Sequence, residues 1–172
     1  MPPSDAKPLA DAKPLADAEP LVYEQSVFIR ANATTVERCF TQQDLMHQWL
    51  NPALICEPIG DWRTTVGSEF DFRLQVPLLA PALHAVVKER RPGLVVWEFD
   101  GFFKGCDRWE ALPETDESGI AGKPSGTTLL NRFEFTIPNP LVSFGFRQIA
   151  AGWTKKDMEA QLQRLKQVAE RL

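Results

Sequence analysis

Titratable and amide side chains alternate with aromatic ones along three strand-like stretches, and these are the residues with which the chain could do chemistry. They are Glu98, Arg108, Glu110, Asn131, Arg132 and Glu134. Successive residues of a strand point to opposite faces of a sheet, so one parity places this set on a solvated, salt-bridged face. The other parity buries an Arg or a Glu. A buried Glu with a raised pKa suits general acid or base catalysis of an enolisation or dehydration. The sequence leaves both parities open.

The two histidines, His47 and His84, offer a weaker signal for acid–base chemistry. His47 lies in a short helical stretch, where we expect a surface or packing role. His84 lies in the predicted strand 82–91. It faces solvent if Leu83 and Ala85 point inward, and it lines the interior as a possible acid or base if the parity is opposite.

The cysteines and the loop motifs give no sign of a metal or cofactor site. Cys39, Cys56 and Cys106 lie far apart, and the chain has no CxxC pair, whereas zinc needs three or four close ligands. It also has no GxSxG elbow, P-loop or GxGxxG motif. We therefore expect no metal and no cofactor. Few, widely spaced thiols favour reduced cysteines and a cytoplasmic location.

Composition and charge narrow the class of protein. A chain of 172 residues with 44% hydrophobic residues is long enough for one domain with a substantial core. A net charge of −4 argues against nucleic acid as a partner. No apolar run approaches the ~20 residues that span a bilayer, and the N-terminus lacks the pattern of a secretory signal.

The first 21 residues differ from the rest of the chain. DAKPLA occurs at 5–10 and again at 11–16, and DAEPL follows at 17–21. This Pro-containing segment has too little bulky apolar content to fold alone, so we predict a flexible arm at 1–21 and a folded domain at 22–172. The arm is either a tether or a docking segment that presents its leucines to a protein partner.

Periodicity predicts a strand, two short helices, about six further strands and one long C-terminal helix. The predicted strands are 22–30, 54–59, 68–76, 82–91, 94–101, 105–112 and 127–137, with helices at 33–41, 44–50 and 139–172 and a loop at 113–126. We expect Thr34 or Thr35 to lie near the N-cap of the first helix and Asp44 to cap the second. Short links imply an antiparallel meander. One helix cannot fill a strongly curved sheet of this size, which predicts an apolar cavity between them.

Apolar side chains of the strands and of the long helix are the candidates to line that cavity and bind a ligand. They are Phe70, Phe72, Leu74, Trp97, Phe99, Trp109, Phe133, Phe135, Ile149 and Trp153. Ordinary core packing is the alternative for each of them.

The stretch VPLLAPAL at 76–83 is apolar where a polar hairpin tip is expected. Leu78 and Leu79 are therefore candidates for a cavity gate, a protein-docking surface or shallow membrane contact. The apolar stretch 137–146 is a second candidate for the same surface.

Several phrases of the sequence resemble the START-like helix-grip superfamily, also called SRPBCC proteins, and within it the polyketide cyclase/dehydrase and lipid-transport branch. The phrases are FIRANATTVERCFT, HQWLNP, VGSEFDF, VVKERRPGLVVWEF, SGTTLLNRFEF and WTKKDMEAQLQRLKQVAE. The resemblance implies an α+β helix-grip fold, in which a curved antiparallel sheet of six or seven strands wraps around the C-terminal helix. It also implies a deep apolar cavity. Members of the superfamily bind lipids, sterols, polyketides or plant hormones, and some catalyse cyclisation or dehydration.

The first functional hypothesis is a carrier or sensor of a hydrophobic small molecule of lipid, isoprenoid or polyketide type. A cyclase or dehydratase is an alternative, because it needs only one titratable group beside the ligand. A protein-interaction module that uses the arm and the apolar tip is the other alternative. Whether the chain is an enzyme stays open at this point, since a fold alone does not select among these functions.

Overall fold

The computed structural model describes residues 19–75, 82–115, 124–138 and 151–172. Along the chain the elements are β1 (Leu21–Ile29), α1 (Ala33–Thr41), α2 (Gln43–Met46), β2 (Leu54–Pro58), β3 (Glu69–Leu74), β4 (Ala82–Arg91), β5 (Leu94–Gly101), β6 (Lys104–Thr115), β7 (Pro124–Thr136) and α4 (Ala151–Ala169). None of the helices in these ranges is long and apolar enough to cross a membrane.

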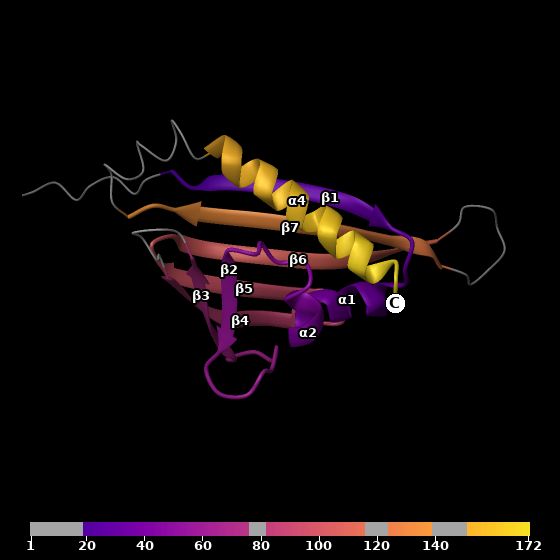
Figure 1. Ribbon diagram of the computed structural model, residues 1–172, viewed down its shortest axis with the longest axis horizontal. Coiled ribbons are helices and arrows are strands. Elements are labelled where there is room, and N and C mark those ends of the chain that lie inside the picture. The colour runs from indigo at the N-terminus through magenta and orange to yellow at the C-terminus, as the bar shows by residue number, and fades with distance from the viewer. Residues whose placement is uncertain (1–18, 76–81, 116–123, 139–150) are drawn as a thin grey trace, which may run out of the picture.

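Seven strands form one antiparallel sheet in the order β1-β7-β6-β5-β4-β3-β2. The strands follow one another as hairpins except for β1, which pairs with β7 at the far edge. The sheet curls, and α4 crosses its concave side near β1 and β7 (Figure 1). The predicted α+β helix-grip fold is confirmed.

The C-terminal helix is held on the sheet by an apolar stripe and by polar ties at its end. The stripe recurs at three- and four-residue spacing and is buried: Met158, Leu162, Leu165, Val168 and Ala169. Lys166 Nζ donates to the carbonyl of Phe28 at 2.8 Å, and Glu170 accepts from the backbone N–H of Arg30 at 2.9 Å. These contacts fix α4 against β1.

The ends of several elements differ from the sequence predictions. Asn32, which the sequence prediction did not name, caps α1, because its side chain accepts from the backbone N–H of Thr35 at 2.8 Å; Thr34 and Thr35 lie in the first turn, near this cap as predicted. The predicted helix 44–50 shortens to Gln43–Met46, and Asp44 lies in its first turn rather than at its N-cap. β1 begins at Leu21, the last residue of the predicted arm.

The predicted loop 113–126 is strand at both of its ends, and residues 116–123 lie outside the described ranges. β6 runs to Thr115 and β7 starts at Pro124, with Pro113 paired to Thr127 in register. Polar and Pro-rich composition suggested a loop. Instead, the pairing of β6 with β7 extends into this stretch, so its end residues belong to the two strands. Of the predicted helix 139–172, the residues up to 150 lie outside the described ranges, as do Leu78, Leu79 and most of the arm.

Candidate functional site

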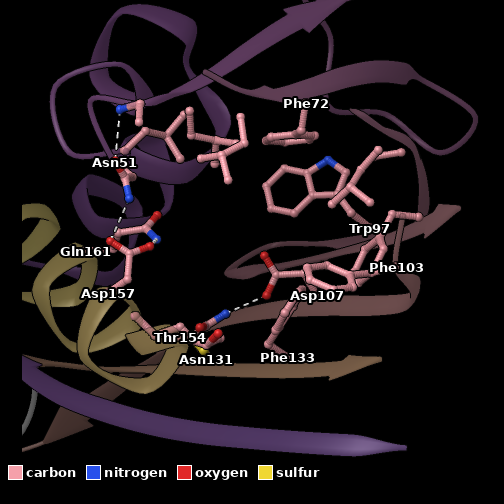
Figure 2. Close-up of a pocket in the computed structure, with 18 of the residues that line it drawn as sticks. Asn51, Phe72, Trp97, Phe103, Asp107, Asn131, Phe133, Thr154, Asp157 and Gln161 are labelled. Carbon is pink, nitrogen blue, oxygen red and sulfur yellow. Dashed lines mark hydrogen bonds between the residues drawn. The ribbon is translucent and has the colours of Figure 1, made fainter. Parts of the chain in front are cut away.

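A cavity of about 730 Å³ lies between the concave face of the sheet, the first turns of α4 and the segment from α2 to β2 (Figure 2). Most of its lining is aromatic or aliphatic. The ring centroids of Phe99 and Phe133 stack 5.2 Å apart on one wall, and those of Trp49 and Trp109 lie 5.0 Å apart on another. Concave, apolar spaces of this size are typical of small-molecule sites.

The structure brings seven of the ten predicted ligand-binding residues to this cavity: Phe72, Leu74, Trp97, Phe99, Trp109, Phe133 and Trp153. Phe70 is buried in the core outside the lining, against Trp62 at 5.1 Å. Phe135 is also core and stacks on Tyr23 at 6.1 Å. Ile149 lies outside the described residues.

Strand parity places most of the polar candidates on the convex side of the sheet. Arg108 pairs with Glu110 at 2.9 Å, and Arg132 pairs with Glu134 at 3.1 Å. Glu98 is exposed there too. The solvated-face alternative is therefore the right one for these residues.

Of the two histidines, one lies on the surface and the other packs against neighbouring residues. His84 is exposed between two carboxylates, with its ring nitrogens 3.4 Å from Glu69 and 3.4 Å from Asp71. His47 has Nε2 within 3.1 Å of the carbonyl of Cys56, and its ring meets the edge of Trp62. Neither histidine lines the cavity.

Asn131 is the exception to the outward set, because it shares the parity of Phe133 and points into the cavity. It is buried, and its Nδ2 donates to Asp107 Oδ1 at 2.7 Å and to the carbonyl of Arg108 at 3.2 Å (Figure 2). The sequence prediction placed Asn131 in one set with Arg132 and Glu134. Because side chains alternate between the two faces of a strand, Asn131 lies on the face opposite to theirs.

Asp107 is the polar residue at the centre of the cavity wall, and the sequence analysis missed it. Its β6 position pairs with Trp97 on β5 and with Phe133 on β7, so it lies in a row of inward-facing aromatics. Trp109, two residues further along β6, donates from Nε1 to Asp107 Oδ2 at 2.7 Å. The signal was present in the sequence: an Asp two residues before an inward-facing Trp shares its face.

The surroundings of Asp107 make it an unusual carboxyl group. Burial raises its pKa from 3.8 to about 6, although the hydrogen bonds from Trp109 and Asn131 oppose the rise. The side chain still keeps accessible surface, because it borders the hollow rather than packed atoms. Within the described ranges, no Lys or Arg forms an ion pair with it.

A second polar group lies where α4 meets the segment before β2. Asp157 accepts from Asn51 Nδ2 at 2.9 Å and from Gln161 Nε2 at 2.7 Å, and Asn51 also accepts from the backbone N–H of Ala53 (Figure 2). These bonds tie α4 to the loop across one side of the cavity. Trp153, with 78% of its surface exposed, also lines the cavity and so marks its rim.

The thiols and the acidic groups suggest no other chemistry in the described ranges. Burial raises the pKa of Cys39 to about 11 and that of Cys56 to about 12, so both thiols stay protonated at neutral pH. Three or more His, Cys, Asp or Glu side chains placed to hold a metal ion are not found in this part of the chain.

Comparisons with known proteins agree with the fold. Residues 20–170 match a family described as polyketide cyclase / dehydrase and lipid transport. No curated protein matches the chain significantly.

Solved structures share the fold at low sequence identity. The Zhui aromatase/cyclase from Streptomyces sp. superposes with a TM-score of 0.67 at 12% identity, covering 89% of this chain and 95% of that one. A protein from Thermus thermophilus gives a TM-score of 0.68 at 13% identity, over 87% and 97% of the two chains. A START superfamily protein from Mycobacterium smegmatis gives 0.57 at 16% identity, over 87% and 94%.

Proposed function

Because this chain belongs to the polyketide cyclase / dehydrase and lipid transport family, we propose that it binds a hydrophobic small molecule between the sheet and α4 and acts as its carrier or sensor. The observation that supports this most strongly is the cavity of about 730 Å³, into which Trp97, Phe99 and Phe133 point. A well-packed core has few voids larger than a water molecule, so a hollow of this size points to an occupant.

The side chains of the cavity wall indicate which class of molecule would bind there. In the sheet part of the lining, aromatic rings from β3, β5, β6 and β7 surround one carboxyl and one amide group, Asp107 and Asn131. Such a wall favours a molecule with a large apolar body and few polar groups. Lipid, isoprenoid and polyketide-like molecules all meet that description.

A titration with 9-methylanthracene tests the proposal, since this flat and wholly apolar probe can accept energy from the cavity tryptophans. Trp97 and Trp109 line the space, so a bound probe should quench their emission and emit itself. We expect a saturable signal with one probe per chain and a Kd of about 10 μM or tighter, in line with the usual binding energy per ligand atom. A signal that never saturates would count against the cavity as a binding site.

A second function, acid–base catalysis on the bound molecule, is favoured by one observation. Asp107 combines accessible surface in the cavity with a pKa of about 6, close to the range in which a carboxyl group exchanges protons at neutral pH. Compounds extracted from the wild type and from Asp107→Asn separate the two functions. A dehydratase predicts that the variant retains a compound heavier by one water, whereas a carrier predicts the same compound in both.

The predicted protein-docking function rests on residues that the structure does not describe. Leu78, Leu79 and the first two repeats of the arm lie in those ranges. Docking of a protein or membrane there stays a prediction, and deletion of 1–18 followed by partner capture would test it.

A further inference from the structure

We infer that Asp107 selects the ligand by accepting a hydrogen bond from a donor group on it, a hydroxyl or a protonated amine, and that the cavity disfavours carboxylates. This inference rests on the proposed binding function and adds the polar chemistry of the ligand to it. It gives Asp107 a recognition role that the apolar wall alone does not supply.

Asp107 lies between aromatic residues of the neighbouring strands. The backbone register sets Trp97, Asp107, Phe133 and Tyr23 side by side across β5, β6, β7 and β1. Of this row, Trp97, Asp107 and Phe133 line the cavity, so a carboxyl group separates two aromatic side chains of its wall (Figure 2). Any flat ligand that stacks on this row brings its edge or its substituents beside Asp107.

The carboxylate of Asp107 can accept more hydrogen bonds than its neighbours in the described ranges donate. An ionised carboxylate has about four acceptor positions. The side chains of Asn131 and Trp109 occupy one position on each oxygen, both at 2.7 Å. Within the described ranges, no other donor reaches Asp107, and its remaining accessible surface borders the cavity. The vacant acceptor positions can thus be satisfied by a donor of the ligand.

The negative charge of Asp107 also favours a donor group on the ligand. Asp107 is without a cation in the described part of the chain, and an uncompensated carboxylate in apolar surroundings is costly. A ligand hydroxyl or ammonium lowers that cost, while a ligand carboxylate beside Asp107 adds a like charge. The other charged side chains of the lining, Lys156 and Asp157, both come from α4, and Lys156 is exposed. Among the described residues, the only charge in the sheet part of the lining is therefore negative.

A purely structural role for Asp107 makes a different prediction. In that case its carboxylate serves only to satisfy the donors of Trp109 and Asn131, and ligands with and without a donor group should bind equally well. The two roles are separable because the structural one predicts no change in ligand preference when Asp107 is replaced.

Four anthracenes of the same size test the inference: 9-methylanthracene, 9-anthracenemethanol, 9-(aminomethyl)anthracene and anthracene-9-carboxylic acid. We expect the wild type to bind the alcohol or the amine at least tenfold more tightly than the methyl compound, the usual range for a hydrogen bond to a charged group. The acid should bind most weakly. Comparison of the alcohol with the amine shows which donor the site prefers.

Asp107→Asn should abolish the preference for donors, measured within the variant as the ratio of its affinities for the alcohol or the amine and for 9-methylanthracene. Glu110→Gln is the matched control, since it makes the same change on the opposite face of β6, where Glu110 pairs with Arg108. It should keep the full preference. If Asp107→Asn does not fold, the order of the four probes on the wild type still decides the question.

Equal binding of all four probes, or tightest binding of the acid, would overturn the inference while the cavity proposal stands. Retention of the donor preference in Asp107→Asn would overturn it as well. If none of the four probes binds saturably, the proposed function fails and the inference fails with it.

Discussion

The amide of Asn131 on β7 donates a 2.7 Å hydrogen bond to the carboxylate of Asp107 on β6, inside a cavity whose lining is mostly aromatic or aliphatic. Two neighbouring strands thus contribute both halves of a polar group that faces the hollow. Because buried polar groups are costly unless they are paired, this arrangement needs a reason. Ligand recognition supplies one, and the predictions below test the parts of that account.

Replacing Ala85 by Phe should block the cavity. Ala85 is buried on β4 and lines the hollow, so a phenyl ring there occupies space that a ligand needs. We expect affinity for 9-methylanthracene to fall at least tenfold, equivalent to about 1.4 kcal/mol. The measurement is the same fluorescence titration.

Val86→Phe is the control for this change, since Val86 follows on the same strand and lies on the opposite face of the sheet. It should bind the probe as the wild type does. Equal affinity in Ala85→Phe and the wild type would show that the probe binds elsewhere.

The indole groups of Trp97 and Trp109 predict different costs of substitution. Trp109 Nε1 donates to Asp107 at 2.7 Å, whereas the buried Nε1 of Trp97 has no hydrogen-bond partner in the described ranges. Trp109→Phe should therefore lower the free energy of unfolding by about 1.5–3 kcal/mol more than Trp97→Phe does. Urea denaturation of the two variants measures the difference, and equal losses would mean that the bond to Asp107 contributes nothing.

Asp107 predicts a specific dependence of stability on pH. Its pKa rises from 3.8 in the unfolded chain to about 6 in the folded one, so between these values only the folded form holds the proton. The stabilisation is complete below about pH 4 and is lost as the pH rises to about 6. The difference corresponds to about 3 kcal/mol.

The measurement is the free energy of unfolding of the ligand-free wild type relative to Asp107→Asn, from pH 4 to pH 7. We expect it to fall with rising pH, because Asn cannot titrate. Lys156 and Asp157, the other charged groups of the lining, are present in both proteins. A difference that stays constant, or that rises with pH, would contradict the environment described for Asp107.

Gly93 predicts a steric limit at the turn between β4 and β5. Its φ of 76° is a conformation that L side chains rarely adopt, and a Cβ there would lie 2.8 Å from the carbonyl oxygen of Ala111. Gly60 also has a positive φ, of 94°, but nothing lies within 4 Å of its Cβ position. Gly60→Ala should cost about 1 kcal/mol of unfolding free energy from backbone strain alone.

Gly93→Ala should cost clearly more than Gly60→Ala, because the contact with Ala111 adds to the strain. Thermal or urea unfolding of both variants measures this. Similar losses would mean that the hairpin relaxes away from the contact.

Periodicity was enough to predict the seven strands and the C-terminal helix, because a half-buried strand or helix repeats its apolar residues at a fixed interval. The same rule would have placed Asp107 and Asn131 beside Trp109 and Phe133, had each residue been assigned by parity. Asp107 was missed, and Asn131 was grouped with Arg132 and Glu134, because polar residues were sorted by type, as a group opposite the aromatics. Polarity alone does not reveal the face of a strand.

Other features depended on contacts between distant segments. Phe70 and Phe135 carry the same apolar pattern as the cavity residues, yet Trp62 and Tyr23 pack against them and place them in the core. The cap at Asn32 depends on the backbone geometry at the start of α1. The sequence did not single out Asn32, because the neighbouring threonines are also common capping residues. Which apolar residues border a hollow depends on packing, and periodicity does not report packing.

Mass spectrometry of an organic extract of the folded protein, purified from its native host, tests the central claim most directly. The account predicts one small molecule per chain, with a large apolar body and a hydroxyl or amine group and without a carboxylate. A folded protein that yields no such compound would contradict the claim that the cavity is a ligand site.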